Sequence, residues 1–287
     1  MTETSSATDP GPSARTGDLR VRVLSALVLA PLALVAVWLG GWAFALLLAS
    51  AAVLMSIEVT RLLFPGDRDI GSAIPLAVTA VLAIFLAASG LPDAALAAGA
   101  AGLAFSLAWR SWRTERLSPA LIAYPYVVLP LIALIWLRRD DDYGLAAVLW
   151  LLTMVWAIDI CAYFAGRFIG GPKLAPRISP KKTWAGLIGG MVGAVALSLG
   201  FSIWLGSGSA VILALVALGL TVLEQAGDFA ESAMKRRAGV KDSGTLIPGH
   251  GGILDRVDGL IAVVLGAALI SLVHDAANPA AGVLIWP

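Results

Sequence analysis

Long apolar runs fill most of the chain, and short polar or glycine-containing connectors separate them. A hydrocarbon core about 30 Å thick needs about 20 apolar residues in helical form to cross it. Runs of this length predict nine membrane-spanning helices, at 23–40, 42–57, 72–90, 92–109, 119–137, 143–165, 184–205, 209–227 and 255–274. The pattern therefore predicts an all-α, polytopic integral membrane protein.

The composition supports a membrane protein and excludes several other classes. Of the 287 residues, 59% are hydrophobic and 14% are charged, whereas soluble domains average about 45–50% and about 25%. The net charge of +1 lacks the basic excess that a nucleic acid partner requires. A single cysteine, Cys161, excludes an intramolecular disulfide and a thiolate metal site.

Polarity also divides the chain into regions. Residues 1–20 are polar and rich in Ser, Thr, Pro and Gly, which predicts a disordered cytoplasmic tail. Residues 21–287 are predicted to form a single transmembrane domain. Within it, residues 21–142 have short, ordinary loops and are interpreted as scaffold spans. Residues 143–287 carry all five lysines and are interpreted as catalytic spans and cytoplasmic loops.

The distribution of Lys and Arg predicts the orientation. With a cytoplasmic N-terminus and nine spans, 18 of the 20 basic residues fall on the cytoplasmic side, and only Arg138 and Arg139 fall outside. The positive-inside rule disfavours the inverted topology. We therefore expect a multi-pass protein of the cell (inner) membrane with an outer C-terminus and an active site on the cytoplasmic side.

One charged segment lies at the end of the eighth predicted span. Glu224, Asp228, Glu231 and Lys235 are spaced 4, 3 and 4 residues apart, which places them on one helix face. An ionised group at the membrane boundary is costly unless it is paired, hydrated or metal-bound. The alternative is an ordinary helix end that emerges into water.

A glycine-rich loop follows, opened by Lys241-Asp242 and closed by Gly249-His250-Gly251-Gly252. Glycines let backbone N–H groups approach phosphate oxygens. Taken alone this signal is weak, because most glycine loops bind nothing and a lone histidine is more often structural than catalytic.

The last predicted span begins at Asp255-Arg256-Val257-Asp258. Its two aspartates are three residues apart and lie on one side of the first helical turn. Ionised carboxylates suit Mg²⁺, which shares its remaining positions with phosphates and water. Acidic capping of a helix start is the alternative. The nearby Asp228, Lys235 and Lys241 favour a metal–phosphate site.

A second charged loop follows the sixth predicted span. Asp159, Tyr163 and Arg167 are four residues apart and share a helix face. In the segment Ser179-Pro180-Lys181-Lys182-Thr183 the proline ends any helix, and Thr183 is placed to cap the next span. The lysines and the free N–H groups of that helix start predict an anion site. Equally, the lysines could only set topology or touch anionic headgroups.

With these residues assembled, the chain resembles the phosphatidate cytidylyltransferase (CDP-diacylglycerol synthase) family. The family signature runs S-x-hydrophobic-K-R, then K-D-x-small, then H-G-G-hydrophobic-x-D-R-x-D. The matching positions are Ser232, Met234, Lys235, Arg236, Lys241, Asp242, Gly244, Ile247, Pro248, His250, Gly251, Gly252, Ile253, Asp255, Arg256 and Asp258. By motif the resemblance covers residues 156–275. Ala185 departs from it, since relatives usually carry Glu or Gln there.

The resemblance implies transfer of CMP from CTP to phosphatidic acid, giving CDP-diacylglycerol and pyrophosphate in phospholipid biosynthesis. It implies Mg²⁺ as cofactor, with a second cation left open, membrane lipid as surroundings, a homodimer and no nucleic acid partner. Asp228 and Asp255 correspond to metal-binding aspartates, with Asp258 close by as a third expected ligand. The expected catalytic residues are Asp228, Lys235, Lys241, Asp242, Asp255, Arg256 and Asp258. The expected substrate-binding residues are Asp159, Tyr163, Arg167, Ser179, Lys181, Lys182, Thr183, His250, Gly251 and Gly252.

Three other functions share features with this sequence. A CTP-dependent polyprenol or phytol kinase shares the setting, but the full signature argues against it. A CDP-alcohol phosphotransferase would carry D-G-x-x-A-R, which the sequence lacks. An ion-coupled transporter would use Glu58, Asp159 and Glu224 as intramembrane charges. The clustering of charges at one membrane face favours an interfacial enzyme instead.

Overall fold

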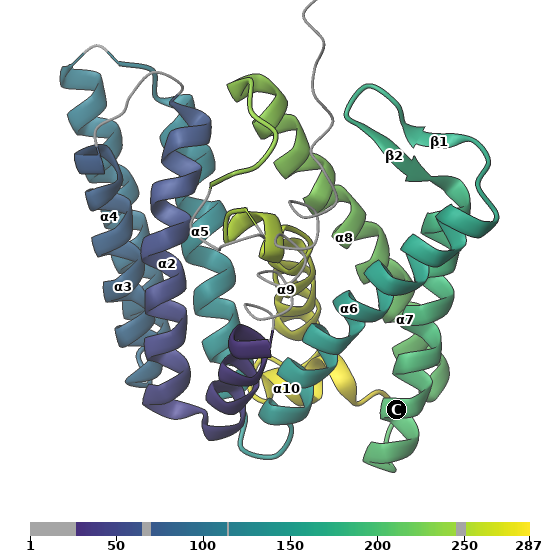
Figure 1. The fold of residues 1–287 in the computed structure, drawn as a ribbon. Coiled ribbons are helices and arrows are strands. Elements are labelled where there is room, and N and C mark those ends of the chain that lie inside the picture. The colour runs from purple at the N-terminus through teal and green to yellow at the C-terminus, as the bar shows by residue number, and fades with distance from the viewer. Residues whose placement is uncertain (1–26, 65–69, 114, 245–250) are drawn as a thin grey trace, which may run out of the picture.

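The computed structural model describes residues 27–64, 70–113, 115–244 and 251–287. The predicted tail and His250 lie outside these residues. The described chain is a helical bundle with one small hairpin (Figure 1). Its helices are α1 (Leu27–Leu39), α2 (Gly41–Leu63), η1 (Ile70–Ala73), α3 (Ile74–Ala88), α4 (Pro92–Trp112), α5 (Ser118–Arg138), α6 (Gly144–Phe168), α7 (Trp184–Leu205), α8 (Ala210–Ala238), α9 (Leu254–His274) and α10 (Pro279–Leu284).

Each predicted apolar run coincides with a helix. In the described part of the chain, seven helices are long and apolar enough to cross a membrane, namely α2, α3 with the end of η1, α5, α6, α7, α8 and α9. The shorter α1 and the alanine-rich α4 fall outside these seven. A helical protein with several spans is therefore confirmed, whereas the count of nine stays a prediction.

The all-α prediction is wrong for one segment, residues 173–183. Strands β1 (Lys173–Ala175) and β2 (Ser179–Thr183) pair antiparallel, with Lys173 opposite Thr183. Prolines here exclude helix, as predicted, and the chain forms a hairpin instead. The hairpin lies at the same end of the bundle as the C-terminal end of α8 (Figure 1).

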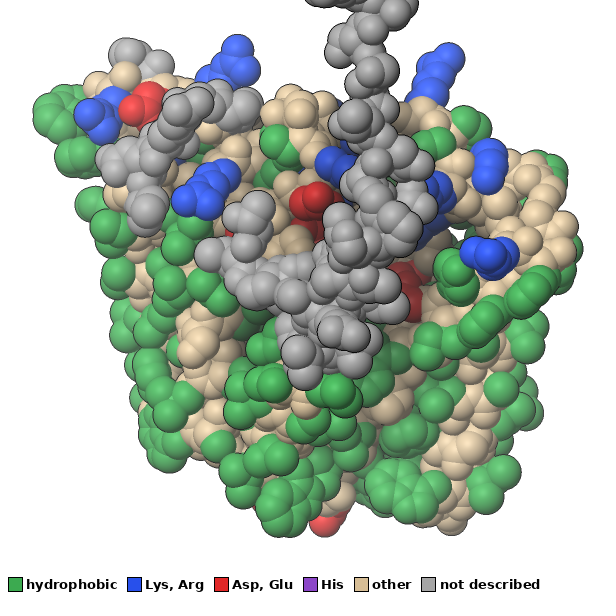
Figure 2. All heavy atoms as spheres, viewed as in Figure 1, with side chains coloured by type: hydrophobic (Ala, Val, Ile, Leu, Met, Phe, Trp, Pro, Cys, Tyr) green, Lys and Arg blue, Asp and Glu red, His purple; other side chains and the backbone are tan. Residues whose placement is uncertain are grey.

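The core and the outer surface have different side chains. Large side chains such as Met55, Trp150 and Met154 are fully buried between the helices. Other large apolar side chains face outward, and Ile203 and Val273 are 80% and 90% exposed. Figure 2 shows hydrophobic side chains over most of the visible surface and Lys and Arg gathered at its upper end. This distribution suits a helical bundle surrounded by lipid.

Close helix packing positions α7 against α6. A methyl group added at Gly189 would lie 2.9 Å from the Cys161 carbonyl oxygen, and one at Gly193 would lie 3.0 Å from that of Ala157. Small residues such as these glycines let two membrane helices approach closely.

At the end of the bundle opposite the hairpin, Arg138 and Arg139 donate hydrogen bonds to backbone carbonyls. Arg138 donates to the carbonyls of Val37 and Trp38 at 2.8 and 3.0 Å, and Arg139 donates to that of Ala88. These carbonyls belong to the C-terminal ends of α1 and α3, where helix carbonyls lack partners within the helix. The two basic residues predicted to lie outside therefore bind helix ends.

Candidate functional site

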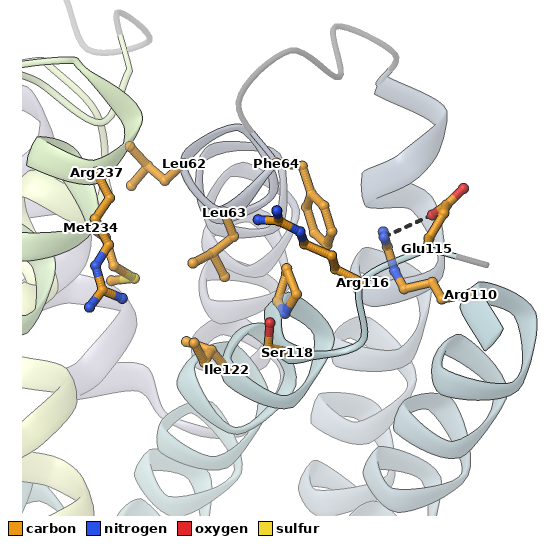
Figure 3. Close-up of a pocket in the computed structure, with 11 residues that line it drawn as sticks. Leu62, Leu63, Phe64, Arg110, Glu115, Arg116, Ser118, Ile122, Met234 and Arg237 are labelled. Carbon is orange, nitrogen blue, oxygen red and sulfur yellow. Dashed lines mark hydrogen bonds and ion pairs between the residues drawn. The ribbon is translucent and has the colours of Figure 1, made fainter. Parts of the chain in front are cut away.

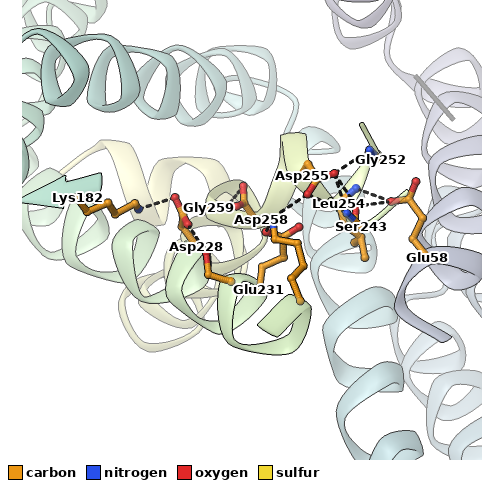
Figure 4. A network of polar contacts seen from close by, with 12 residues as sticks. Glu58, Lys182, Asp228, Glu231, Ser243, Gly252, Leu254, Asp255, Asp258 and Gly259 are labelled. Atoms are coloured by element: carbon orange, nitrogen blue, oxygen red, sulfur yellow. Dashed lines mark hydrogen bonds and ion pairs between the residues drawn. The ribbon is translucent and has the colours of Figure 1, made fainter. Parts of the chain in front are cut away.

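Two glycines bring α8 and α9 into contact where the signature aspartates lie. A methyl group at Gly227 would lie 2.7 Å from the Asp258 carbonyl oxygen. One at Gly259 would lie 2.8 Å from Oε1 of Glu224. Neither position has room for a side chain, so the two backbones approach closely. As a result Asp228 and Asp258 lie side by side, and their carboxylates interact electrostatically (Figure 4).

Lys182 joins the hairpin to α8. Its Nζ lies 2.5 Å from Oδ2 of Asp228 and donates to Oε1 of Gln225 at 3.0 Å. The ring of Phe229 lies beneath it, with its centroid 5.1 Å from Nζ. The lysine is mostly buried, so its charge is balanced where the hairpin meets the bundle. Residues 46 positions apart thus share one ion pair.

Asp255 anchors a second cluster at the start of α9. Its carboxylate accepts from Lys235 Nζ at 2.8 Å, from Gly252 N at 2.8 Å and from both the amide and the hydroxyl of Ser243. Lys235 also pairs with the fully buried Glu231 one helical turn earlier. The predicted face of α8 therefore carries charges that are paired with α9 and with the hairpin.

A pocket of 340 Å³ lies between α6, β2, α7 and α8. Its lining includes six of the predicted substrate-binding residues, namely Asp159, Tyr163, Arg167, Lys181, Lys182 and Thr183. Arg167 donates to the Tyr163 hydroxyl at 3.1 Å, which keeps both on the same face of α6. The predicted common face of Asp159, Tyr163 and Arg167 thus lines this pocket, and the substrate-binding roles of the six residues stay predictions.

Thr183 ends the hairpin and begins α7, as predicted. Its Oγ1 accepts from the backbone N–H of Gly186 at 3.1 Å, and Thr183 itself is buried. The adjacent Gly166 of α6 packs closely against it, since an added methyl would lie 3.0 Å from this Oγ1. Because Lys182 directly precedes Thr183, this cap also positions Lys182.

Charges from both loops meet at Asp159. Its carboxylate interacts electrostatically with Lys182 of β2, Asp228 of α8 and Arg256 of α9. Residues of the upstream loop and of the downstream signature therefore lie in one electrostatic neighbourhood.

The other predicted residues lie in the turn after α8, at the start of β2 and around the start of α9. Lys241 and Asp242 are exposed in the turn after α8, and Arg256 is exposed on the first turn of α9. Ser179 begins β2 and is half-buried. Gly251 has a φ of +83°, which favours glycine, and Gly252 donates to Asp255. The roles assigned to these residues stay predictions.

The carboxylates of α8 and α9 are the candidate ligands for magnesium. Among the described residues, no group of three or more His, Cys, Asp or Glu side chains is placed to hold a metal ion. Mg²⁺ commonly uses only one or two carboxylates, with substrate phosphates and water completing its shell. Asp228 and Asp258 offer two neighbouring carboxylates of this kind, so the site fits the ion. Asp255 already accepts hydrogen bonds from Lys235, Ser243 and Gly252.

A larger pocket of 740 Å³ lies between α2, α5 and α8 (Figure 3). Arg110, Arg116 and Arg237 line it together with apolar residues such as Leu63 and Met234. Arg237 follows Asp228 by nine residues, which is half a turn around the helix. The pocket therefore lies on the other side of α8 and contains none of the predicted site residues.

Three residues in these clusters lay outside the predicted set. Ser243 and Gln225 carry no sequence signal of their own, because their partners come from distant elements. Glu58 did carry one, as a lone carboxylate in an apolar span. For Glu58 the sequence indicated only the role of an intramembrane charge in a transporter. In the structure it is fully buried and accepts hydrogen bonds from the start of α9.

Comparisons with known proteins agree with these observations. A model of the cytidylyltransferase family matches residues 20–273. A phosphatidate cytidylyltransferase of Brucella suis is 39% identical over 258 residues, covering 89% of this chain and 93% of that protein. The protein of the same name from Pseudomonas aeruginosa is 34% identical over 265 residues, covering 86% and 94%. One from Bacillus subtilis is 44% identical over 129 residues, covering 45% and 48%. The chain belongs to the cytidylyltransferase family.

Proposed function

We propose that this protein transfers CMP from CTP to phosphatidic acid, forming CDP-diacylglycerol and releasing pyrophosphate. The observation that carries the proposal is the similarity over nearly the full length to proteins named phosphatidate cytidylyltransferase. The neighbouring charges of Asp159, Lys182, Asp228 and Arg256 support it, because one site must receive two phosphate-bearing substrates.

The reaction is an in-line attack of a phosphatidate oxygen on the α-phosphorus of CTP. A new P–O bond forms, and the bond to the bridging oxygen of pyrophosphate breaks. The nucleophile is already anionic, so the chief task is to neutralise charge, which fixed cations do effectively. Lys182 of β2 and Lys235 of α8 would each exchange a carboxylate partner for a phosphate oxygen.

Magnesium would be held by Asp228 and Asp258, with Asp255 as the third expected ligand. When bound, the ion would neutralise negative charge on the triphosphate and help to orient it. The lipid phosphate is assigned to the pocket beside Lys181 and Lys182, because Thr183 begins a spanning helix and so lies near headgroup depth.

The finer topology also belongs to the proposal. We infer nine spans in the cell (inner) membrane, a cytoplasmic N-terminus and an active site on the cytoplasmic side. The 18 to 2 distribution of basic residues supports this orientation. We also propose a homodimer, with residues 21–142 as scaffold and residues 143–287 as the catalytic part.

The reaction is tested with purified protein, CTP, Mg²⁺ and phosphatidic acid in mixed micelles. The expected products are CDP-diacylglycerol, identified by mass spectrometry, and one pyrophosphate for each lipid formed. Release of CDP together with a doubly phosphorylated lipid would instead identify a kinase and contradict the proposal.

Orientation is tested by a reporter fused after Pro287 that is active only in the cytoplasm. We expect it to be silent, while the same reporter in the turn at Lys241 should be active. A strong signal from the C-terminal fusion would contradict the nine-span topology.

A further inference from the structure

Helix α9 begins without a capping side chain from its own neighbourhood. The residue before it, Ile253, makes no side-chain cap hydrogen bond. The first N–H groups of a helix lack partners within the helix, and burying them unpaired is costly. At this helix start, partners must therefore come from elsewhere in the fold.

Glu58 supplies them from α2, about 195 residues earlier in the chain. Its Oε1 accepts from Ile253 N at 3.0 Å, and its Oε2 accepts from Leu254 N at 2.9 Å. The side chain is fully buried. Carboxylates are favoured at helix N-termini, where the helix dipole is positive. Glu58 thus caps α9 across the bundle (Figure 4).

The same carboxylate reaches the other side of the glycine loop. Ser243 Oγ lies 3.1 Å from Glu58 Oε2 and 2.9 Å from Asp255 Oδ2. A hydroxyl has one hydrogen to donate, so this serine connects the two carboxylates and serves one of them at a time. Asp255 in turn receives Lys235. A continuous chain of contacts therefore leads from the scaffold helix α2 to a lysine of α8.

Two glycines have no side chain where this carboxylate lies. A methyl group at Gly244 would lie 2.6 Å from Glu58 Oε1, and one at Gly252 would lie 2.5 Å from Oε2. The described ends of the loop are thus fitted around Glu58 from both sides. The glycines of the signature have a structural reason here besides any contact with phosphate.

We propose that Glu58 is a positioning residue for the reaction, holding both described ends of the glycine loop and the start of α9 so that Asp255 and Lys235 face the nucleotide phosphates. This rests on the proposed function for the identity of the ligand. It goes beyond that function by assigning part of the site to a span outside the catalytic half.

Glu58→Gln is the principal test, because it keeps the volume but replaces one acceptor oxygen with an NH₂ group that cannot accept. We expect kcat/KM for CTP to fall by about ten- to a hundredfold, the range for one lost charge-assisted hydrogen bond. The matched control is Ser56→Ala on the same helix, a buried hydroxyl that donates to Ala52 O at 2.7 Å. An effect of Glu58→Gln no larger than that of the control would overturn the proposal.

Ser243→Ala separates positioning from general stability. If Glu58 acts through this hydroxyl, the double variant should lose much less kcat/KM than the product of the two single losses. Losses that simply multiply would overturn the connection through Ser243.

Amide hydrogen exchange tests the inference without turnover. In Glu58→Gln the peptide covering residues 251–260 should exchange faster than in the wild type, while Ser56→Ala should leave it unchanged. Unchanged exchange in Glu58→Gln would overturn the proposal even if the chain proved active. If the wild-type protein makes no CDP-lipid, the proposed function is overturned. The hydrogen exchange result then decides whether Glu58 positions the loop and the start of α9.

Discussion

The first five helices and the remainder of the chain use charged side chains differently. In the first part, Arg110 pairs with Glu115, five residues away, and Arg138 and Arg139 bind carbonyls at helix ends. In the second part, Lys182 pairs with Asp228 and Lys235 pairs with Asp255, each joining two separate elements.

The difference separates two ways of building a membrane protein. Charges of the first kind complete hydrogen bonding where helices end, and substrates have no reason to displace them. Charges of the second kind face one another across elements, where an incoming phosphate would replace one partner in the proposed reaction. Glu58 is the exception, because it lies in the first part and serves the second.

The largest effect is expected from Asp258→Asn. Removing this carboxylate should lower kcat by about a hundred- to a thousandfold, the usual cost of losing one preorganised electrostatic group. Among the described residues, its hydrogen bond comes from Gly259 N, so the thermal midpoint should not fall. Initial rates over a range of Mg²⁺ concentrations, together with thermal unfolding, measure both effects.

Asp93→Asn in the first turn of α4 is the matched control, since it removes an exposed carboxylate from the scaffold part. Equal losses in the two variants would contradict the division between the parts.

The next effect is expected from Gly227→Ala. The added methyl would lie 2.7 Å from the Asp258 carbonyl oxygen and would force α8 and α9 apart. Displacement of reacting groups by about 1 Å can cost about a hundredfold in rate. Overpacking should also lower the free energy of unfolding by about 1–3 kcal/mol.

Gly219→Ala on the same helix meets nothing within 4 Å and serves as the control. Alanine there should match or exceed the wild-type stability. If both variants keep full activity, the contact between the helices does not set the site.

A smaller and more selective effect is expected from the hairpin lysines. Lys181→Ala combined with Lys182→Ala should raise the KM for phosphatidic acid by about tenfold to a hundredfold, and that for CTP less. Of the single variants, Lys182→Ala should matter more, because Lys182 contacts Asp228 and Gln225 while Lys181 is exposed.

The measurement is a saturation curve for each substrate in mixed micelles. A change confined to CTP would assign the lysines to the triphosphate. With both curves unchanged, the lysines would only set topology.

The smallest effect is expected from Thr183→Ala, which removes the cap of α7. Loss of such a cap lowers the free energy of unfolding by about 1 kcal/mol. Thr153→Ala on α6 is the control, since that hydroxyl bonds to Leu149 O within its own helix. Thermal unfolding should show a lower midpoint for Thr183→Ala alone, and equal midpoints would contradict the capping role.

The sequence predicted the helices well because apolar length is a strong signal in a membrane protein. It also predicted the cap at Thr183 and the face that Asp159, Tyr163 and Arg167 share on α6. Periodicity and local stop signals were sufficient for these predictions, because each depends on residues close together in the chain or on the face of one helix.

The features that the sequence did not predict depend on contacts between distant segments. Neither the hairpin at residues 173–183 nor the binding of Ser243 to Glu58 leaves a local pattern. A buried carboxylate in an apolar span indicates that some partner exists, but it does not indicate which one. Two partners of Glu58 proved to be backbone N–H groups at the start of α9, and a backbone group leaves no sequence signature.

Helices α8 and α9 cross at Gly227 and Gly259, next to Asp228 and Asp258. The distance between these two carboxylates therefore depends on the backbone. Changes of rotamer can adjust the separation of most paired side chains, but here the backbones that carry the two side chains are in close contact. The separation of Asp228 and Asp258 is therefore set by the packing of the two helices. Substitutions of lipid-facing residues would leave this separation unchanged, whereas a different separation would require α8 and α9 to pack differently.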